Sequence, residues 1–282
     1  MSTPKAKYNY VPMMQLEDFE KKYGDFFAFR FEDGILEVKM HTKGGPVQWS
    51  YQFHHALAEL WTDIGHAKWI ECLILTSTDP YWIHETDTDS FKEVEQSGDP
   101  DKKFNVQIYD TLKIVENFVN DIEIPTIAAI NGRGIHWEMC MMSDVCFCTP
   151  DFILQDDHYG MNGGHVPGDG MGMCLQELLG IKRGNYMMIT CGGMNAQQCL
   201  EAGVVNAVVE KDQIVDHAWD FARKYIMSKS RACRRLTHYV CVRPWKSIIE
   251  RDFRIHVLSE MYSFNITGTA HDFDYIKYEG EE

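Results

Sequence analysis

Two histidines flank a glycine-rich loop that leads to an aspartate, and this segment has the residue types best suited to acid–base chemistry. His158 and His165 enclose the loop, and Asp169 follows in Val166-Pro167-Gly168-Asp169-Gly170. An imidazole whose pKa is about 7 can take a proton from water, and a carboxylate at its other ring nitrogen fixes the tautomer and stabilises the imidazolium. Either histidine can be that base, although a histidine in such a loop is often only solvated. Asp169 alone is better explained as the cap of a helix over residues 170–179, and the two roles are compatible.

Four further residues are candidates, each with a structural alternative. His136 stands where a helix begins, and the positive end of the helix dipole disfavours its cation, so we expect a neutral imidazole that donates a hydrogen bond. Trp49 begins another helix, where a core anchor is the simpler interpretation. Of the adjacent His54 and His55, we expect one to face solvent. Glu260 lies in the last long helix, where a glutamate usually faces solvent, but the apolar residues around it predict a half-buried position.

Length, composition and charge exclude several classes of function. The chain of 282 residues can bury one sizeable core, and its 45% hydrophobic and 24% charged residues are typical of a globular protein. A net charge of −15 opposes binding to nucleic acids or anionic membranes. Residues 1–14 lack the apolar segment of a signal peptide, and no stretch is long and apolar enough to span a bilayer. We therefore expect a cytoplasmic protein with no nucleic-acid or membrane partner.

The cysteines and the remaining histidines give no sign of a metal centre. The nine cysteines are irregularly spaced, without a Cys-x-x-Cys pair, so we expect buried thiols rather than disulfides or a metal cluster. The other histidines lack ligand-like spacing, and the sequence predicts no metal site.

Periodic apolar segments predict the elements that must position the candidate residues. Two alternating runs, 26–31 and 35–41, surround Glu32-Asp33-Gly34 and predict a β-hairpin. Helices are expected over 49–64 and 104–120, and strands over 71–76, 123–130, 145–148 and 152–155. Helices follow at about 170–179, 183–190, 196–202, 212–228, 231–242 and 245–263. This order predicts a parallel α/β core with a helical C-terminal extension.

One strand-and-turn segment resembles a known family. Ile124-Pro125-Thr126-Ile127-Ala128-Ala129-Ile130-Asn131-Gly132 is similar to the opening of the crotonase (enoyl-CoA hydratase/isomerase) signature, and Asp144 follows twelve residues later, as in that family. The segments 152–155 and 202–209 extend the resemblance, which covers most of residues 25–265. It implies an α/β crotonase fold, with a spiral core of repeated ββα units and a helical C-terminal region. It also implies four parts: an N-terminal extension (1–24), the crotonase core (25–210), a helical trimerisation region (211–265) and an acidic C-terminal tail (266–282).

Six positions are similar to one branch of the family, 6-oxocamphor hydrolase and related β-diketone hydrolases. The matching residues are Trp49, His54, His136, His158, Asp169 and Glu260. One loop differs, because the stretch before Val166 is one residue longer here and contains His165. The family's usual run of glycines, which holds a thioester oxyanion, is also replaced by Gly134-Ile135-His136-Trp137-Glu138. Bulky side chains there do not suit ordinary acyl-CoA chemistry.

The resemblance implies hydrolysis of a carbon–carbon bond in a β-diketone by a retro-Claisen route. His158, oriented by Asp169, would activate water, and His136 would stabilise the enolate. Trp49 and the backbone N–H groups of Thr86 and Trp137 would be further donors. His54 and Glu260 complete the implied site, and Trp49, Trp82, Trp137, Tyr159 and methionines are expected to line a pocket for an apolar, cyclic substrate. No metal or other cofactor is required.

The resemblance also implies a homotrimer or a dimer of trimers. The main alternative function is a cyclase, isomerase or dehydratase acting on a natural-product intermediate that is not bound to coenzyme A. A non-catalytic scaffold is disfavoured, because it needs none of the six polar positions, and classical enoyl-CoA hydratase activity ranks last.

Overall fold

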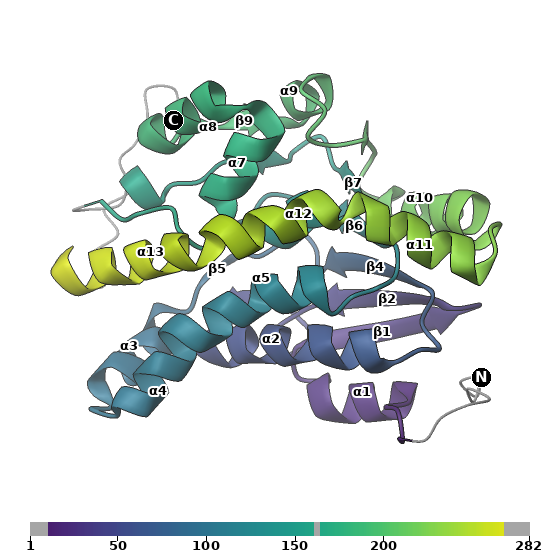
Figure 1. Cartoon of the computed structure of the whole chain (residues 1–282), viewed down its shortest axis with the longest axis horizontal. Coiled ribbons are helices and arrows are strands. Elements are labelled where there is room, and N and C mark those ends of the chain that lie inside the picture. Colours follow the sequence, from purple (N-terminus) through teal and green to yellow (C-terminus); the bar gives the residue numbers. More distant parts are fainter. Residues whose placement is uncertain (1–10, 161–163, 268–282) are drawn as a thin grey trace.

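The predicted β-hairpin begins a six-stranded sheet in the computed structural model, which describes residues 11–160 and 164–267 (Figure 1). The sheet order is β1-β2-β4-β6-β7-β10, in which only the β1–β2 pair is antiparallel. Its strands are β1 (Phe27–Glu32), β2 (Ile35–Met40), β4 (Cys72–Ser77), β6 (Thr126–Ile130), β7 (Val145–Cys148) and β10 (Ala207–Val208). Two small sheets pair β3 (Gln48–Trp49) with β5 (Glu85–Thr86) and β8 (Ile153–Leu154) with β9 (Met194–Asn195).

Helices surround the sheet and account for most of the remaining described chain. They are α1 (Leu16–Tyr23), α2 (Tyr51–His66), α3 (Thr88–Gln96), α4 (Pro100–Phe104), α5 (Thr111–Asn120), α6 (Glu138–Met142), α7 (Met171–Leu179), α8 (Ile181–Thr190), α9 (Ala196–Glu201), α10 (Ile214–Phe221), α11 (Arg231–Cys241), α12 (Arg243–Ile248) and α13 (Arg254–Thr267). Short π-helical turns η1 (Asn105–Asp110), η3 (Ala222–Met227) and η4 (Ile249–Phe253) continue α4, α10 and α12, and η2 (His158–Gly160) is a 3₁₀ turn. No helix of the described residues is long and apolar enough to cross a membrane.

The central strands are buried on both faces, which explains their continuous apolar runs. In β4, Leu73 and Leu75 point into the main core, whereas Ile74 points into a second cluster on the other face. That cluster is closed by α10, through residues such as Trp219. The sheet is therefore a rigid layer between two hydrophobic cores.

The C-terminal helices form a rod across the molecule, in front of the sheet and beside α5 (Figure 1). In α13, Val257, Glu260, Met261 and Phe264 follow the spacing of one helix face, and this face turns inward. This placement explains why a late glutamate is 3% exposed.

Most predicted elements are confirmed, including the hairpin, the parallel core and the helical C-terminal region. The predicted helix over 104–120 begins earlier and contains the π-helical turn η1. The N-terminal extension includes α1, whose Phe19 and Tyr23 are buried in the main core. Residues 1–10 and the acidic tail from residue 268 onward lie outside the described residues.

A buried histidine attaches α11 to the core. Nδ1 of His238 hydrogen-bonds Asp144 Oδ2 at 2.6 Å, and its Nε2 bonds the carbonyl oxygen of Ile122 at 3.0 Å. Asp144 also accepts a bond from the backbone N–H of Thr126, at the start of β6. Asp144, which directly precedes β7, thus connects α11 to β6 and β7.

We predict that His238→Ala destabilises the fold by about 2 to 4 kcal/mol, because it leaves a cavity and unpaired buried polar groups. Urea-induced unfolding monitored by circular dichroism measures this change. The control is His66→Ala, at the exposed end of α2, and we expect it to change stability by less than about 0.5 kcal/mol. Equal stability of the two variants would show that the contact of α11 does not depend on His238.

Candidate active site

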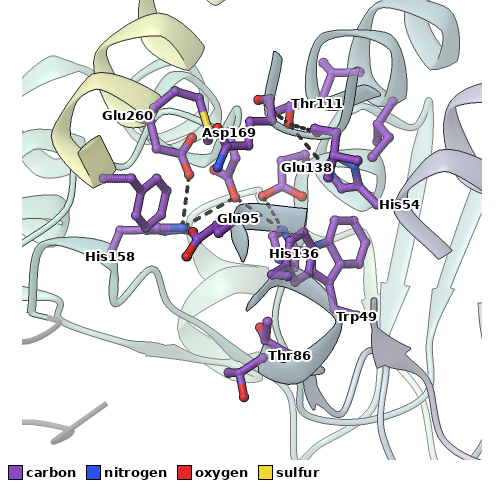
Figure 2. Close-up of a pocket in the computed structure, with 18 residues that line it drawn as sticks. Trp49, His54, Thr86, Glu95, Thr111, His136, Glu138, His158, Asp169 and Glu260 are labelled. Atoms are coloured by element: carbon purple, nitrogen blue, oxygen red, sulfur yellow. Dashed lines mark hydrogen bonds and ion pairs between the residues drawn. The ribbon is translucent and has the colours of Figure 1, made fainter. Parts of the chain in front are cut away.

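A cavity of about 170 Å³ opens between α2, α5 and α13 and contains most of the residues singled out in the sequence (Figure 2). Its lining residues are Trp49, His54, Thr86, Thr88, Phe91, Glu95, Val106, Gln107, Thr111, Ile114, Val115, His136, Glu138, His158, Asp169, Glu260, Met261 and Phe264. One side is polar, with two imidazoles and several carboxyl groups, and the other is largely apolar. An apolar cavity of about 150 Å³ accepts a benzene-sized ring, so this one suits a ring-sized molecule.

His158 lies on the polar side, held by a carboxylate that the sequence analysis did not assign. Its Nδ1 bonds Asp156 Oδ1 at 2.9 Å, and its backbone N–H donates to the same oxygen at 3.0 Å. Its Nε2 faces Glu260 Oε1 at 3.6 Å and Asp169 Oδ2 at 3.9 Å. The predicted pairing of His158 with an orienting Asp169 is therefore wrong in detail: Asp169 lies at the opposite ring nitrogen, beyond hydrogen-bond distance.

Asp169 connects the two sides of the polar cluster. Its Oδ2 is 3.3 Å from His136 Nδ1 and 3.9 Å from His158 Nε2, whereas its Oδ1 accepts the backbone N–H of Met171 at 3.3 Å. Asp169 thus bonds a first-turn N–H of α7, as predicted, although the N-cap position itself is Gly170, and it also belongs to the site. Gly170 makes this turn possible, because its φ is +124° and a Cβ there would lie 3.0 Å from Glu138 Cγ.

His136 is fixed by an unusual backbone conformation. Its φ is +58°, which is uncommon for a residue other than glycine, and its carbonyl oxygen accepts the indole N–H of Trp82 at 3.1 Å. Two residues earlier, Gly134 approaches the backbone so closely that a Cβ would lie 2.5 Å from Ile83 O. The His136 ring stacks on Trp49, with centroids 3.8 Å apart.

The expectation of a neutral His136 is not supported. Burial lowers the pKa of its imidazole, but the carboxylates of Asp169 and Glu138 outweigh burial and raise the pKa to about 10. The helix it precedes, α6, has only five residues, so its dipole is a weak opposing influence. A pKa in this range favours the cationic form of His136 at neutral pH, and its ring stacks on that of Trp49.

Two of the carboxyl groups hold protons more tightly than usual. Burial and the charge of Asp169 raise the pKa of Glu138 to about 7, although His136 opposes this shift. Burial, again with the charge of Asp169, raises the pKa of Glu260 well above its usual range. Asp169 shows the reverse behaviour: burial opposes its ionisation, but the positive charges of His158 and His136 outweigh burial and lower its pKa. Burial and neighbouring charges thus shift the pKa values of the acids in this cluster in opposite directions.

The pKa of His158 also differs from that of a free imidazole. Burial lowers it, but the nearby charges of Asp156, Asp169 and Glu260 raise it well above its ordinary value. A base of this kind becomes neutral only as the pH rises above the usual histidine range.

His54 is the third imidazole at the cavity. It is 5% exposed, and its Nε2 lies 3.4 Å from Thr111 Oγ1. Burial, together with the charge of His136, lowers its pKa to about 3, so it is neutral. Its neighbour His55 is exposed and bonds Asp110, which confirms that one of the pair faces solvent.

Some expected lining residues lie elsewhere. Trp82 and Trp137 are fully buried in the main core, and Trp137 packs edge-on against Phe152. Tyr159 is 55% exposed and is not among the lining residues. His165, the alternative base, packs against Phe264 and does not line the cavity. The pocket was expected to contain several tryptophans, but of these only Trp49 lines it, whereas Trp82 and Trp137 stack on each other in the core with ring centroids 6.5 Å apart.

Thr86 lines the cavity as expected, in a strand paired with Trp49. The proposed donor roles of its backbone N–H and that of Trp137 stay predictions.

Two residues were missed, Asp156 and Glu138. Asp156 bonds the N–H group two residues later, an Asx-turn that the pattern Asp156-Asp157-His158 is able to form. Glu138 lines the cavity, but its register could not be determined from the sequence, because the segment before it is shorter than in the resembling family.

The cluster also has the donor types of a metal site. Among the described residues, two groups have ligand atoms within 4.8 Å of one another: His136 with Glu138 and Asp169, and Asp156 with His158 and Asp169. Sequence spacing did not predict this, because the ligands come from separate segments. The expectation of a metal-free site stays a prediction.

The fold and the site define an enzyme of the crotonase superfamily. A model of the enoyl-CoA hydratase/isomerase family matches residues 30–255, and the chain belongs to this family. The fatty acid oxidation complex α subunit of Idiomarina loihiensis is 32% identical over 108 residues, 38% of this chain and 15% of that protein. Carnitinyl-CoA dehydratase of Salmonella paratyphi B is 32% identical over 120 residues, 41% of this chain and 44% of that protein. The chain thus spans less than half the length of these curated relatives.

Solved structures extend the comparison over nearly the whole chain. A β-diketone hydrolase from the cyanobacterium Anabaena, bound to (S)-3-oxocyclohexyl acetic acid, has a TM-score of 0.80 and 27% identity, covering 87% of this chain and 96% of that one. An enoyl-CoA hydratase/isomerase from Mycobacterium paratuberculosis has a TM-score of 0.76 and 21% identity, covering 85% and 94%. The similarity to this second structure shows that the two chains have the same fold.

We predict that His136 stabilises the fold at neutral pH and that this contribution is lost as the pH becomes alkaline. A group whose pKa is raised on folding stabilises the protein fully below its unfolded pKa, about 6.5, and this contribution is lost as the pH rises through its folded pKa. For His136 that folded value is about 10. The difference in free energy of unfolding between wild type and His136→Gln should therefore be largest near pH 6 and decline by a few kcal/mol toward pH 10.

Urea titrations at several pH values measure this difference, with His66→Gln as the exposed control. A difference that stays constant over the whole range would mean that His136 is not a cation in the folded protein.

Proposed function

We propose that this enzyme hydrolyses a carbon–carbon bond between two carbonyl groups, without a cofactor, by a retro-Claisen route. The observation that carries the proposal is the bridging position of Asp169, whose Oδ2 faces both His136 and His158 in one cavity. A water-activating imidazole and a cationic imidazole thus lie on opposite sides of one carboxylate. Splitting a 1,3-diketone needs both functions in the same site.

In the first step, His158 takes a proton from water through Nε2 while the water oxygen attacks a carbonyl carbon. Nε2 lies 3.6 Å from Glu260 and 3.9 Å from Asp169, beyond direct hydrogen-bond distance of either, so it is available to a water in the cavity. The tetrahedral oxyanion then forms near the His136 imidazolium. A donor aimed at such a charge typically contributes about 3 to 4 kcal/mol.

In the second step, the bond breaks between the attacked carbon and the carbon that lies between the two carbonyl groups. Its electron pair becomes an enolate on the second carbonyl, and the attacked carbon becomes a carboxyl group. The His158 imidazolium returns the proton to the enolate carbon, so water is added overall and the product is a keto acid. His136 and the indole of Trp49 would stabilise the enolate oxygen.

The cavity favours an uncharged substrate. Its lining includes Glu95, Glu138, Asp169 and Glu260 but neither lysine nor arginine among the described residues. A coenzyme A thioester carries phosphates, and the lining offers neither of these side chains, which commonly bind phosphate. The apolar wall formed by Phe91, Ile114, Phe264 and their neighbours suits a hydrocarbon ring. The likeness to a β-diketone hydrolase that binds a cyclic keto acid supports the same substrate class.

The hydratases and isomerases among the similar proteins support an alternative, in which the same enolate-stabilising groups catalyse a cyclisation, isomerisation or dehydration. Product mass separates the reactions: hydrolysis adds one water, isomerisation adds nothing and dehydration removes one water.

We predict that purified protein converts cyclic 1,3-diketones to keto acids heavier by one water, as measured by mass spectrometry. His158→Ala should lower kcat/KM by at least about 10³-fold, because the water loses its base. His165→Ala, outside the cavity, should change it by less than about threefold. Since the neutral form of His158 is required and its pKa is raised, kcat/KM should increase with pH above neutrality. No turnover of a broad diketone panel, or full activity of His158→Ala, would refute the proposed function.

We further propose that the chain forms a trimer, or a dimer of trimers, through its C-terminal helices. Leu236, Tyr239 and Val240 form a stripe on α11 and are 67%, 56% and 72% exposed. On α13, the exposed Ile255 and Leu258 are spaced in the same way. Contiguous exposed apolar surface commonly marks an interface.

We predict that light scattering gives a mass three or six times the chain mass of 32.7 kDa. The double variant L236E/V240E should shift the mass to that of the monomer, because each new charge would be buried at the interface. F104E, which changes an exposed apolar side chain on α4, is the control and should leave the mass unchanged. A monomeric wild type would refute the assembly without affecting the proposed chemistry.

A further inference from the structure

One carboxylate bonds the ring of His158 but has no part in the proposed reaction steps. Asp156 lies just before η2 and is 5% exposed. Its Oδ1 accepts two bonds from His158, one from the backbone N–H at 3.0 Å and one from Nδ1 at 2.9 Å. This double contact fixes both the position of the residue and the rotation of its ring.

The contact also determines which ring nitrogen carries the proton. A carboxylate only accepts hydrogen bonds, so Nδ1 of the neutral imidazole must be the donor to Asp156. The lone pair is then on Nε2, which is the atom that faces Glu260 and Asp169 across the cavity. With the opposite tautomer, Nε2 would carry a hydrogen and could not accept a proton from water.

Asp169 is unable to take this orienting role in the observed arrangement. Its Oδ1 accepts the N–H of Met171, and its Oδ2 lies 3.3 Å from His136 but 3.9 Å from His158. It also approaches Nε2, the nitrogen that must stay free to accept a proton. Glu260, at 3.6 Å, approaches the same nitrogen.

We propose that Asp156 is the positioning residue that fixes the tautomer and orientation of the His158 imidazole, an inference that rests on the proposed function only for its kinetic readout. Asp169 then acts on the reactive side, between the two imidazoles. The titratable groups around His158 are Asp156, Asp157 and His165 on its own segment, and Asp169, His136 and Glu260 across the cavity.

The test compares two neighbouring substitutions, Asp156→Asn and Asp157→Asn. Both remove one carboxylate beside His158 in the chain, but only Asp156 is seen to hydrogen-bond its ring. The ring is observed directly by ¹⁵N NMR of histidine-labelled protein over a pH titration, with His158→Gln used to assign the signal. This measurement needs no substrate.

In wild type we expect the neutral ring to carry its proton on Nδ1. In Asp156→Asn we expect the Nε2–H tautomer to gain population and the titration midpoint to fall by about one pH unit or more, because an adjacent anion that raises it is lost. Asp157→Asn should keep the wild-type tautomer. With a diketone that wild type cleaves, Asp156→Asn should lower kcat by about 10²- to 10⁴-fold with little change in KM. Its rate should also begin to rise at a lower pH.

An Nε2–H tautomer in wild type, or an unchanged His158 signal in a folded Asp156→Asn variant, would overturn the inference. If that variant does not fold, the wild-type tautomer still decides the question. If the NMR results are as expected but no diketone is cleaved, the proposed function fails and the positioning role of Asp156 stands.

Discussion

The site depends on one interaction, the sharing of a single buried carboxylate oxygen between two imidazoles. Asp169 Oδ2 lies 3.3 Å from His136 and 3.9 Å from His158, and the three side chains are largely buried, with 10 to 15% of their surface exposed. Burying any one of these charges alone would be strongly unfavourable, whereas each here has an opposite charge beside it. The ionisation of each group is therefore a property of the cluster, which explains why one acid in it has a lowered pKa while two others have raised ones.

Distant segments of the chain must hold this cluster at fixed distances. The turn before α7 places Asp169 and needs Gly170 for its backbone conformation. The strained backbone of His136 is held by a bond from Trp82, which is itself fixed in the core. Glu260 arrives from α13, whose position depends on packing against α5 and η1. The rigid layer of sheet and core thus provides the order that a cluster of buried charges requires.

The sequence was sufficient for the fold but not for the pairing of side chains. Alternation in the hairpin and apolar runs such as that of β6 predict their elements directly, because burial imposes those periods. The residues Trp49, His54, His136 and Glu260 were also selected correctly as cavity neighbours. The carboxylate that bonds His158 was not predicted. The orientation of the imidazole ring decides whether Nδ1 meets Asp156 or Asp169, and no pattern in the sequence shows that orientation. The charge of His136 was predicted wrongly for a related reason: two carboxylates, one of them distant in sequence, outweigh a helix dipole.

The same charges act differently at each stage of the proposed reaction. A neutral diketone enters the acidic cavity without repulsion, and its first negative charge develops opposite a cationic imidazole. The second charge, on the enolate, is removed by a proton that His158 already holds and that its neighbouring carboxylates help to retain. Unlike the substrate, the product carries a carboxylate. Once His158 has given up its proton, the ionised Asp169 beside it repels this carboxylate, so the site holds the keto acid less tightly than it holds the reacting anions.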